Sequence, residues 1–165
     1  MAYTRREYIR SVPQSKINRF TLGDTRVEFS HTALLKAVHS STIGSGALEA
    51  ARVTANKFIE SYGRPYRLKV LTYPHEVVRA HKFMGFAGAD RLSRGMSKSF
   101  GRPTSRMAKV AAGQTIIAIA INGDSVERAK AALKRASKKL PVVCKIVTEV
   151  SKLVETKEKT ITPQQ

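Results

Sequence analysis

Small residues and arginines lie close together in the segment Gly85–Met96, which reads GFAGADRLSRGM. Its small residues have neither the spacing of a helical stripe nor the alternation of a strand. Glycine and alanine let a backbone approach an RNA surface closely and donate its amide hydrogens. An arginine can meet a phosphate with two parallel hydrogen bonds. The segment therefore has the chemistry of a loop that contacts a folded polyanion.

The charge of the whole chain supports this interpretation. The 165 residues include 30 Lys and Arg against 12 Asp and Glu, which gives a formal net charge of +18 at pH 7. Half of the excess lies between Arg64 and Lys109, where eleven basic residues accompany only Glu76 and Asp90. Such an imbalance repels itself in a compact fold unless a polyanion cancels it, so nucleic acid is the first candidate partner.

Other classes of protein fit the composition less well. The sequence has no apolar run of about 18 residues and no apolar leader, which disfavours a membrane or secreted protein. The one cysteine, Cys144, permits no internal disulfide and suits the reducing cytoplasm. We expect a single domain over residues 1–150, followed by a tail at 151–165 with little to bury, which we expect to be disordered.

Hydrophobic periodicity predicts a mixed α/β (α+β) domain with a mixed sheet and two main helices. One helix is expected over 47–63, with Gly63 in the left-handed conformation at its end. The second is expected to begin at an Asp124 cap, with Glu127 completing a capping-box-like pair, and to end before Pro141. Strands are expected at 15–23, 27–40, 67–73, 114–121 and 142–150.

Residues 74–113 contain five glycines and two prolines and show no clear strand pattern. We therefore expect a long basic internal loop over about 79–109, although 75–83 and 93–100 could each begin a short helix. Ordering such a chain costs roughly 1–2 kcal/mol per residue. Contacts with phosphates, which release counterions, are a source of compensation.

Enzymatic and metal-binding alternatives find little support. The glycine-rich segment lacks the Gly-Lys-Ser ending and the preceding strand of a phosphate-binding loop. His75 and His81 are six residues apart, which does not place them on one helical face, and no acidic or thiol cluster accompanies them. Cys144 is interpreted as a structural thiol in a strand rather than a nucleophile. We predict no catalytic residue, no cofactor and no metal.

A DNA-binding module is the second alternative, because the second helix is basic. Its cations are Arg128, Lys130, Lys134, Arg135 and Lys138. They are less concentrated than those around the loop, which favours recognition of RNA shape and backbone. The run 134–139 is equally well explained as a solvated helix face.

Seven strings, in chain order, carry a resemblance to a known family. They are AYTRREYI, VPQSKI, ALEAARVTANKFI, YPHEVVRAHK, GADRLSRGM, FGRPTSRMAKV and GQTIIAIAI, and they span about Ala2 to Val147. In these strings the chain is similar to the archaeal and eukaryotic branch of the L-sixteen family of large-subunit ribosomal proteins, also called L-ten-e.

The resemblance implies an α/β-hammerhead fold docked on large-subunit rRNA in the cleft that receives aminoacyl-tRNA, in a protein of the cytoplasmic ribosome that is not an enzyme. The expected partners are rRNA, tRNA in the A and P sites and neighbouring ribosomal proteins, with no membrane and no homo-oligomer. The internal loop is expected to extend toward the peptidyl transferase centre and to support tRNA positioning and subunit maturation. Its residues are Gly85, Phe86, Ala87, Gly88, Ala89, Asp90, Arg91, Leu92, Ser93 and Arg94.

The remaining basic residues of these segments are the expected rRNA contacts. They are Arg5, Arg6, Arg10, Lys16, Arg64, Arg67, Lys69, His75, Arg79, His81, Lys82, Lys98, Arg102, Arg106 and Lys109. The chain departs from the family at Ile43–Gly46, where members commonly have arginine, histidine and asparagine or threonine, and it lacks the further basic segment with which members usually begin.

Overall fold

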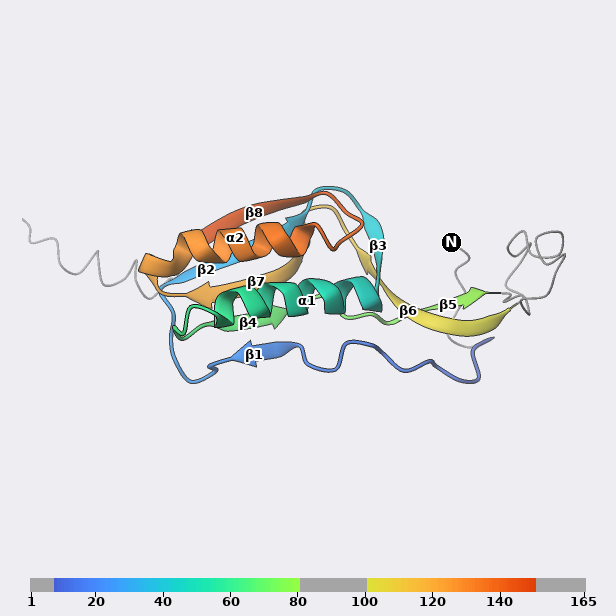
Figure 1. Ribbon diagram of the computed structural model, residues 1–165. Coiled ribbons are helices and arrows are strands. Elements are labelled where there is room, and N and C mark those ends of the chain that lie inside the picture. The colour runs from blue at the N-terminus through green and yellow to red at the C-terminus, as the bar shows by residue number, and fades with distance from the viewer. Residues whose placement is uncertain (1–7, 81–100, 151–165) are drawn as a thin grey trace, which may run out of the picture.

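The computed structural model describes residues 8–80 and 101–150, which form two helices and two sheets (Figure 1). The first sheet has five strands in the spatial order β1 (Thr21–Gly23), β4 (Arg67–Val70), β7 (Thr115–Ile121), β2 (His31–Ala37) and β8 (Cys144–Val150). The second has the order β3 (Ser41–Gly44), β6 (Arg102–Val110) and β5 (Glu76–Ala80). The helices are α1 (Ser45–Glu60) and α2 (Val126–Ser137), the latter preceded by a 3-10 turn at Gly123–Ser125. The expected α+β class is confirmed.

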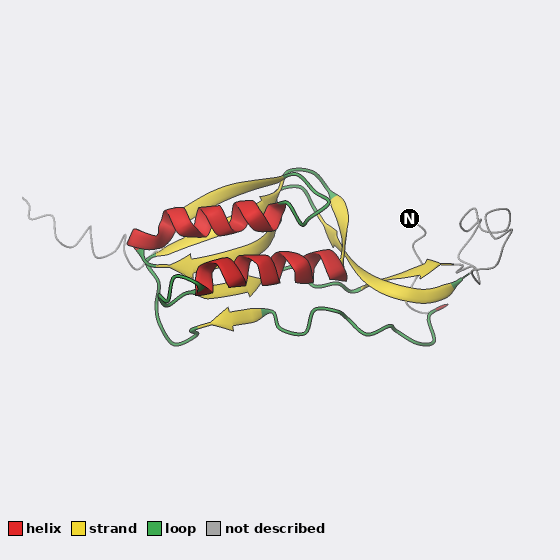
Figure 2. Ribbon diagram, in the orientation of Figure 1, coloured by secondary structure: helices red, strands yellow, loops and turns green. Residues whose placement is uncertain are grey.

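Both helices lie on one face of the five-stranded sheet (Figure 2). Alternation along the strands explains this, because Ala33, Leu35 and Ala37 of β2 are buried while the residues between them are only partly covered. On β7, Ile117 and Ile119 are fully buried on the same side. The apolar rows of these strands thus form one half of the core.

Alanine allows the helices to pack closely on this face. In α1 the buried positions are Ser45, Leu48, Ala51, Ala55 and Ile59, and in α2 they are Ala129, Ala132, Leu133 and Ala136. These positions recur every three or four residues, as a helix with one buried face requires. The helical interpretation of both segments is therefore confirmed, and α1 begins two residues before the expected start.

The helix ends test two sequence expectations. Gly63 follows the end of α1 with φ of +62°, so its predicted left-handed conformation is confirmed. The expected Asp124 cap is wrong, because the residue in the capping position of α2 is Ser125, with no side-chain capping hydrogen bond. A 3-10 turn occupies Gly123–Ser125 and moves the start of the helix past Asp124. Glu127 binds Lys130, at 2.7 Å, instead of completing a capping box.

All described strand pairings are antiparallel, so the expectation of a mixed sheet is wrong in this respect. Strands β7 and β8 run parallel to each other but lie on either side of β2, and α2 connects them across it. The strand–helix–strand pattern of the last third of the chain is present, but its two strands are not neighbours.

The second sheet corrects the prediction of an irregular loop over 74–113. Residues 76–80 and 102–110 are paired strands, so the expected helix start at 75–83 and the loop bounds of 79–109 are wrong at these positions. Their pattern is weak because the buried face consists of few residues, chiefly Val77, Ala108 and Val110. Pro103 lies opposite Arg79, where the register of the β5–β6 pair shifts, and a bulge of this kind tolerates a residue without a backbone N–H.

The expected strands near the N-terminus are shorter in the structure. Only 21–23 of the segment 15–23 is a strand, and only 31–37 of the segment 27–40. Residues 8–20 form an arm that runs beside the sheets (Figure 1), with Ile17 buried in the core. The amide of Val70 donates to the carbonyl of Phe20 at 2.7 Å and fixes the end of this arm.

The residues at Ile43–Gly46, where the chain departs from the family, lie at the junction of β3 and α1. Ile43 is fully buried, Gly44 precedes the first residue of α1, and Ser45 is buried within it. These positions therefore contribute to the core and to the start of the helix.

Substitutions at two glycines with positive φ should separate backbone strain from steric overlap. A Cβ on Gly23, at φ of +84°, would lie 2.1 Å from the carbonyl oxygen of Tyr66, whereas one on Gly63 would have nothing within 4 Å. We expect Gly63→Ala to lower the free energy of unfolding by about 1–2 kcal/mol and Gly23→Ala by about 2–5 kcal/mol. Urea unfolding of both variants measures this, and equal losses would contradict the overlap.

Candidate nucleic-acid interface

The antiparallel ladder of β5 and β6 carries several of the expected rRNA contacts. Ala80 lies opposite Arg102 at its end, and Figure 1 shows this end extending beyond the helices. Arg102 and Lys109 are exposed, while Arg79 and Arg106 are partly covered. The ladder thus carries basic residues on both of the strands that the segment 81–100 joins in sequence.

Two of these arginines hold the N-terminal arm. The guanidinium of Arg79 donates through Nη2 to the carbonyl oxygen of Tyr8, and that of Arg106 donates through Nε to the carbonyl oxygen of Pro13 at 2.6 Å. Arg106 also donates through Nη1 to Tyr73 Oη at 3.2 Å. The sequence indicated neither contact, because a backbone carbonyl partner leaves no mark in residue types. These contacts bring exposed Arg10, which belongs to the arm, close to the ladder.

Glu76 is a described acid within this basic region, and it is locally engaged. Its Oε1 lies 3.2 Å from Lys109 Nζ and 3.4 Å from His75 Nε2. His75 Nδ1 lies 3.1 Å from the carbonyl oxygen of Tyr73. The carboxylate therefore offsets part of the local positive charge and holds His75 at the start of β5.

A separate basic area lies on the face of the five-stranded sheet opposite the helices. Arg67 and Lys69 of β4 pair with Ala120 and Ala118 of β7, and all four residues belong to this outer face. Arg67 also packs against Phe29, with 5.7 Å between the guanidinium carbon and the ring centroid. Arg64, before β4, and Lys16, in the arm, are exposed.

The other expected contacts lie outside the described residues. These are Arg5, Arg6, His81, Lys82, Lys98 and the whole segment Gly85–Arg94, together with the tail at 151–165. Among the described candidates, the structure brings Arg79, Arg102, Arg106, Lys109 and His75 together on or beside the second sheet, and places Arg67 and Lys69 on the first.

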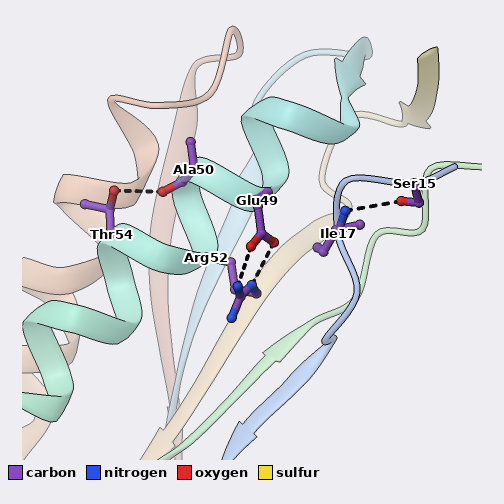
Figure 3. A network of polar contacts seen from close by, with 6 residues as sticks. All are labelled: Ser15, Ile17, Glu49, Ala50, Arg52 and Thr54. Carbon is purple, nitrogen blue, oxygen red and sulfur yellow. Dashed lines mark hydrogen bonds and ion pairs between the residues drawn. The ribbon is translucent and has the colours of Figure 1, made fainter. Parts of the chain in front are cut away.

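Several cations of the two helices contact other side chains of the helical layer, which disfavours the DNA-binding alternative. Arg128 lies over the ring of Tyr62 at 4.4 Å, and Arg135 over the ring of Phe58 at 3.9 Å. The two rings meet edge to face at 5.3 Å, which joins α1 to α2. On α1, Arg52 binds Glu49 of the same helix (Figure 3), and this contact raises the pKa of Arg52. These arginines stabilise the packing and charge balance of the helical layer.

Sequence reasoning missed an exposed aromatic residue between the two sheets. Tyr73 is 52% exposed although its ring lies 5.5 Å from that of Phe20 and its hydroxyl binds Arg106. Burial and exposure alternate strictly from Arg67 to His75, beyond the end of β4, and residue types alone do not show this.

Catalytic and metal sites find no support in the described part of the chain. Cys144 is partly buried, its thiol donates to the carbonyl oxygen of Val142 at 3.3 Å, and burial raises the pKa of this thiol. A raised pKa disfavours the nucleophilic thiolate. No group of three or more metal-binding side chains occurs among residues 8–80 and 101–150, and no helix there is long and apolar enough to span a membrane.

Comparison with known proteins identifies the family. The family model described as Ribosomal protein L16p/L10e matches residues 1–147. The chain is 45% identical over 147 residues to large ribosomal subunit protein uL16 of Staphylothermus marinus. The match covers 88% of this chain and 84% of that protein. It is 42% identical over 153 residues to the protein of the same name from Methanococcus maripaludis, covering 92% and 88% of the two chains.

A third relative of the same name, from Archaeoglobus fulgidus, is 40% identical over 149 residues and covers 89% of this chain and 86% of its own. The resemblance noted in the sequence is therefore confirmed. The chain belongs to the ribosomal protein L16p/L10e family, whose members are structural proteins of the ribosome and not enzymes.

Proposed function

We propose that this chain binds large-subunit rRNA beside the cleft that receives aminoacyl-tRNA, in the cytoplasmic ribosome, and presents Gly85–Arg94 toward the peptidyl transferase centre. In this role it supports tRNA positioning in the A and P sites and late maturation of the subunit, next to neighbouring ribosomal proteins. The observation that carries the proposal is the β5–β6 ladder. Because Ala80 lies opposite Arg102, the segment between them starts and ends on the same pair of basic, hydrogen-bonded strands.

The ladder supplies what rRNA contact requires of a protein surface. Cations that neutralise phosphates release condensed counterions, which favours binding and makes it depend on salt. Arg102 and Lys109 are exposed for such contacts. Arg79 and Arg106 fix the arm that contains Arg10, so that arm and ladder act as one surface. The remaining candidate contacts, among them Arg5, Arg6, His81, Lys82 and Lys98, extend this surface in the proposal.

Co-sedimentation tests the ribosomal role directly. We expect the full chain to travel with the large subunit in stoichiometric amount through moderate salt and to dissociate only in high salt, because its contacts with rRNA are chiefly ionic. Sucrose-gradient fractions analysed by quantitative mass spectrometry measure the ratio. Substoichiometric, transient association would instead favour an RNA-modifying factor.

Replacing one exposed cation of the ladder should weaken rRNA binding without affecting the fold. For Arg102→Ala we expect a lower affinity for a large-subunit rRNA fragment, and a slope of log K against log salt reduced by about 0.7–0.9, the value for one lost phosphate contact. Titrations at several salt concentrations measure both quantities. Lys134→Ala, on the exposed side of α2, is the matched control and should bind as the unmodified chain does. An equal loss of affinity for Lys134→Ala would indicate that the helices form the interface.

Deletion of Gly85–Arg94 should separate docking from function. Residues of the two described ranges form a hydrophobic core among themselves, so we expect an unchanged thermal transition and retained rRNA binding. We expect subunits that contain the shortened chain to be impaired in tRNA accommodation or in maturation. Translation assays in vitro measure tRNA accommodation, and sucrose-gradient profiles of the ribosomal subunits measure maturation. Normal translation would refute the role proposed for the loop.

A further inference from the structure

Residues 67–75 present an alternating row of side chains to the outside of the molecule. Leu68, Val70, Thr72 and Pro74 are buried. The residues between them are exposed, apart from the partly covered Arg67. We name this outward row the β4 stripe; it consists of Arg67, Lys69, Leu71, Tyr73 and His75.

The pairing of β4 with β7 continues one residue beyond the end of β4. The amide of Leu71 still donates to the carbonyl oxygen of Ile116 at 2.9 Å, so the chain remains attached to β7 at this point. At about 3.3 Å per residue, an extended chain from residue 67 to residue 73 spans roughly 20 Å. This is the length of a few nucleotides of extended RNA, near the lower end of single-strand binding sites.

Tyr73 is a positioned and accessible aromatic ring. Phe20 packs against it with 5.5 Å between ring centroids and an interplanar angle of 35°, and Arg106 donates to its hydroxyl at 3.2 Å. It nevertheless remains 52% exposed, and the neighbouring Leu71 is 46% exposed. Holding an exposed ring in one orientation lowers the entropy lost when a planar ligand stacks on it.

A hollow adjoins the basic end of the stripe. It has a volume of about 360 Å³, and its lining includes the small side chains of Ala118 and Ala120 on β7, beside the longer Arg67 and Lys69 on β4. Three threonines complete its lining: Thr21, Thr25 and Thr32. The described residues that line it include two cations and no acid. Hydroxyl groups and cations in one open hollow are complementary to the ribose and phosphate groups of RNA.

Resting on the proposed ribosomal function, we propose that the β4 stripe binds an unpaired segment of rRNA. Arg67 and Lys69 contact its phosphates at the hollow, and a base stacks on Tyr73. Charge complementarity selects a nucleic acid as the ligand, because cations and an exposed ring lie along one row. The ring selects an unpaired strand, since the bases of a duplex stack on one another and cannot reach it.

Binding of the full chain to a uridine-only RNA of about 12 nucleotides, followed by fluorescence anisotropy, tests the proposal. We expect Tyr73→Ala to weaken binding by about tenfold or more, since base stacking on an aromatic side chain contributes this much. Its salt slope should not change, because no charge is lost. Arg67→Ala and Lys69→Ala should each reduce the slope by about 0.7.

Two controls separate stacking from loss of structure. Tyr73→Phe keeps the ring and should bind within about twofold of the unmodified chain, since the stacking surface is retained. Tyr62→Ala removes a tyrosine that is 40% exposed beside α1 and should leave binding of the uridine RNA unchanged. Leu71→Glu, at a half-exposed position, adds a carboxylate inside the stripe and should weaken binding without a shift in thermal transition.

Unchanged binding by Tyr73→Ala, or an equal loss for Tyr62→Ala, would overturn the proposal. The proposal would also be overturned if Tyr73→Ala lost as much affinity for an RNA duplex of the same length as for the uridine RNA. That result would show a general effect and not stacking on an unpaired base. Failure of the stripe is distinguishable from failure of the ribosomal role, because the unmodified chain would then still co-sediment with the large subunit. If the unmodified chain does not associate with the large subunit at all, the proposed function itself fails.

Discussion

Mutual repulsion of 30 cationic side chains is the constraint under which this chain must fold. The structure meets it by separating charge from the core. The buried faces of the sheets and helices consist almost entirely of alanine, leucine, isoleucine and valine. Several of the few acids are engaged locally, as Glu49 with Arg52, Glu76 with Lys109, Glu127 with Lys130 and Glu149 with Lys36. Such surface pairs contribute little to stability individually, so most of the positive charge remains directed outward.

The same separation gives the two faces of the five-stranded sheet different properties. One face is closed by α1 and α2, which are joined by stacked aromatic and guanidinium groups. On the other face, the small residues Ala118 and Ala120 lie beside Arg67 and Lys69 and line an open hollow with them. The β6–β7 turn joins the second sheet to the first. In this turn the Gly113 amide donates to the carbonyl oxygen of Ala37. Basic groups on both sheets are therefore held on one scaffold.

Strong periodicity made the central elements predictable from sequence. The helix at α1 and the strand at β7 each have long apolar rows, whereas β3, β5 and β6 each bury only one or two apolar residues, such as Ile43 and Val77. A strand with so small a buried face resembles a loop when it is rich in arginine. The clustering of cations could also be predicted, but not their use to hold the arm through Tyr8 and Pro13. The accessibility of Tyr73 depends on how the two sheets meet, which sequence does not reveal.

The attachment of the N-terminal arm has a consequence for the order of events during synthesis. Tyr8 and Pro13 bind arginines that follow them by 71 and 93 positions, and β2 pairs with β8, the last described strand. A chain is synthesised from its N-terminus, so the carbonyl groups of Tyr8 and Pro13 are made long before the arginines that bind them. The arm can therefore take its place beside the second sheet only after the chain has been made as far as Arg106.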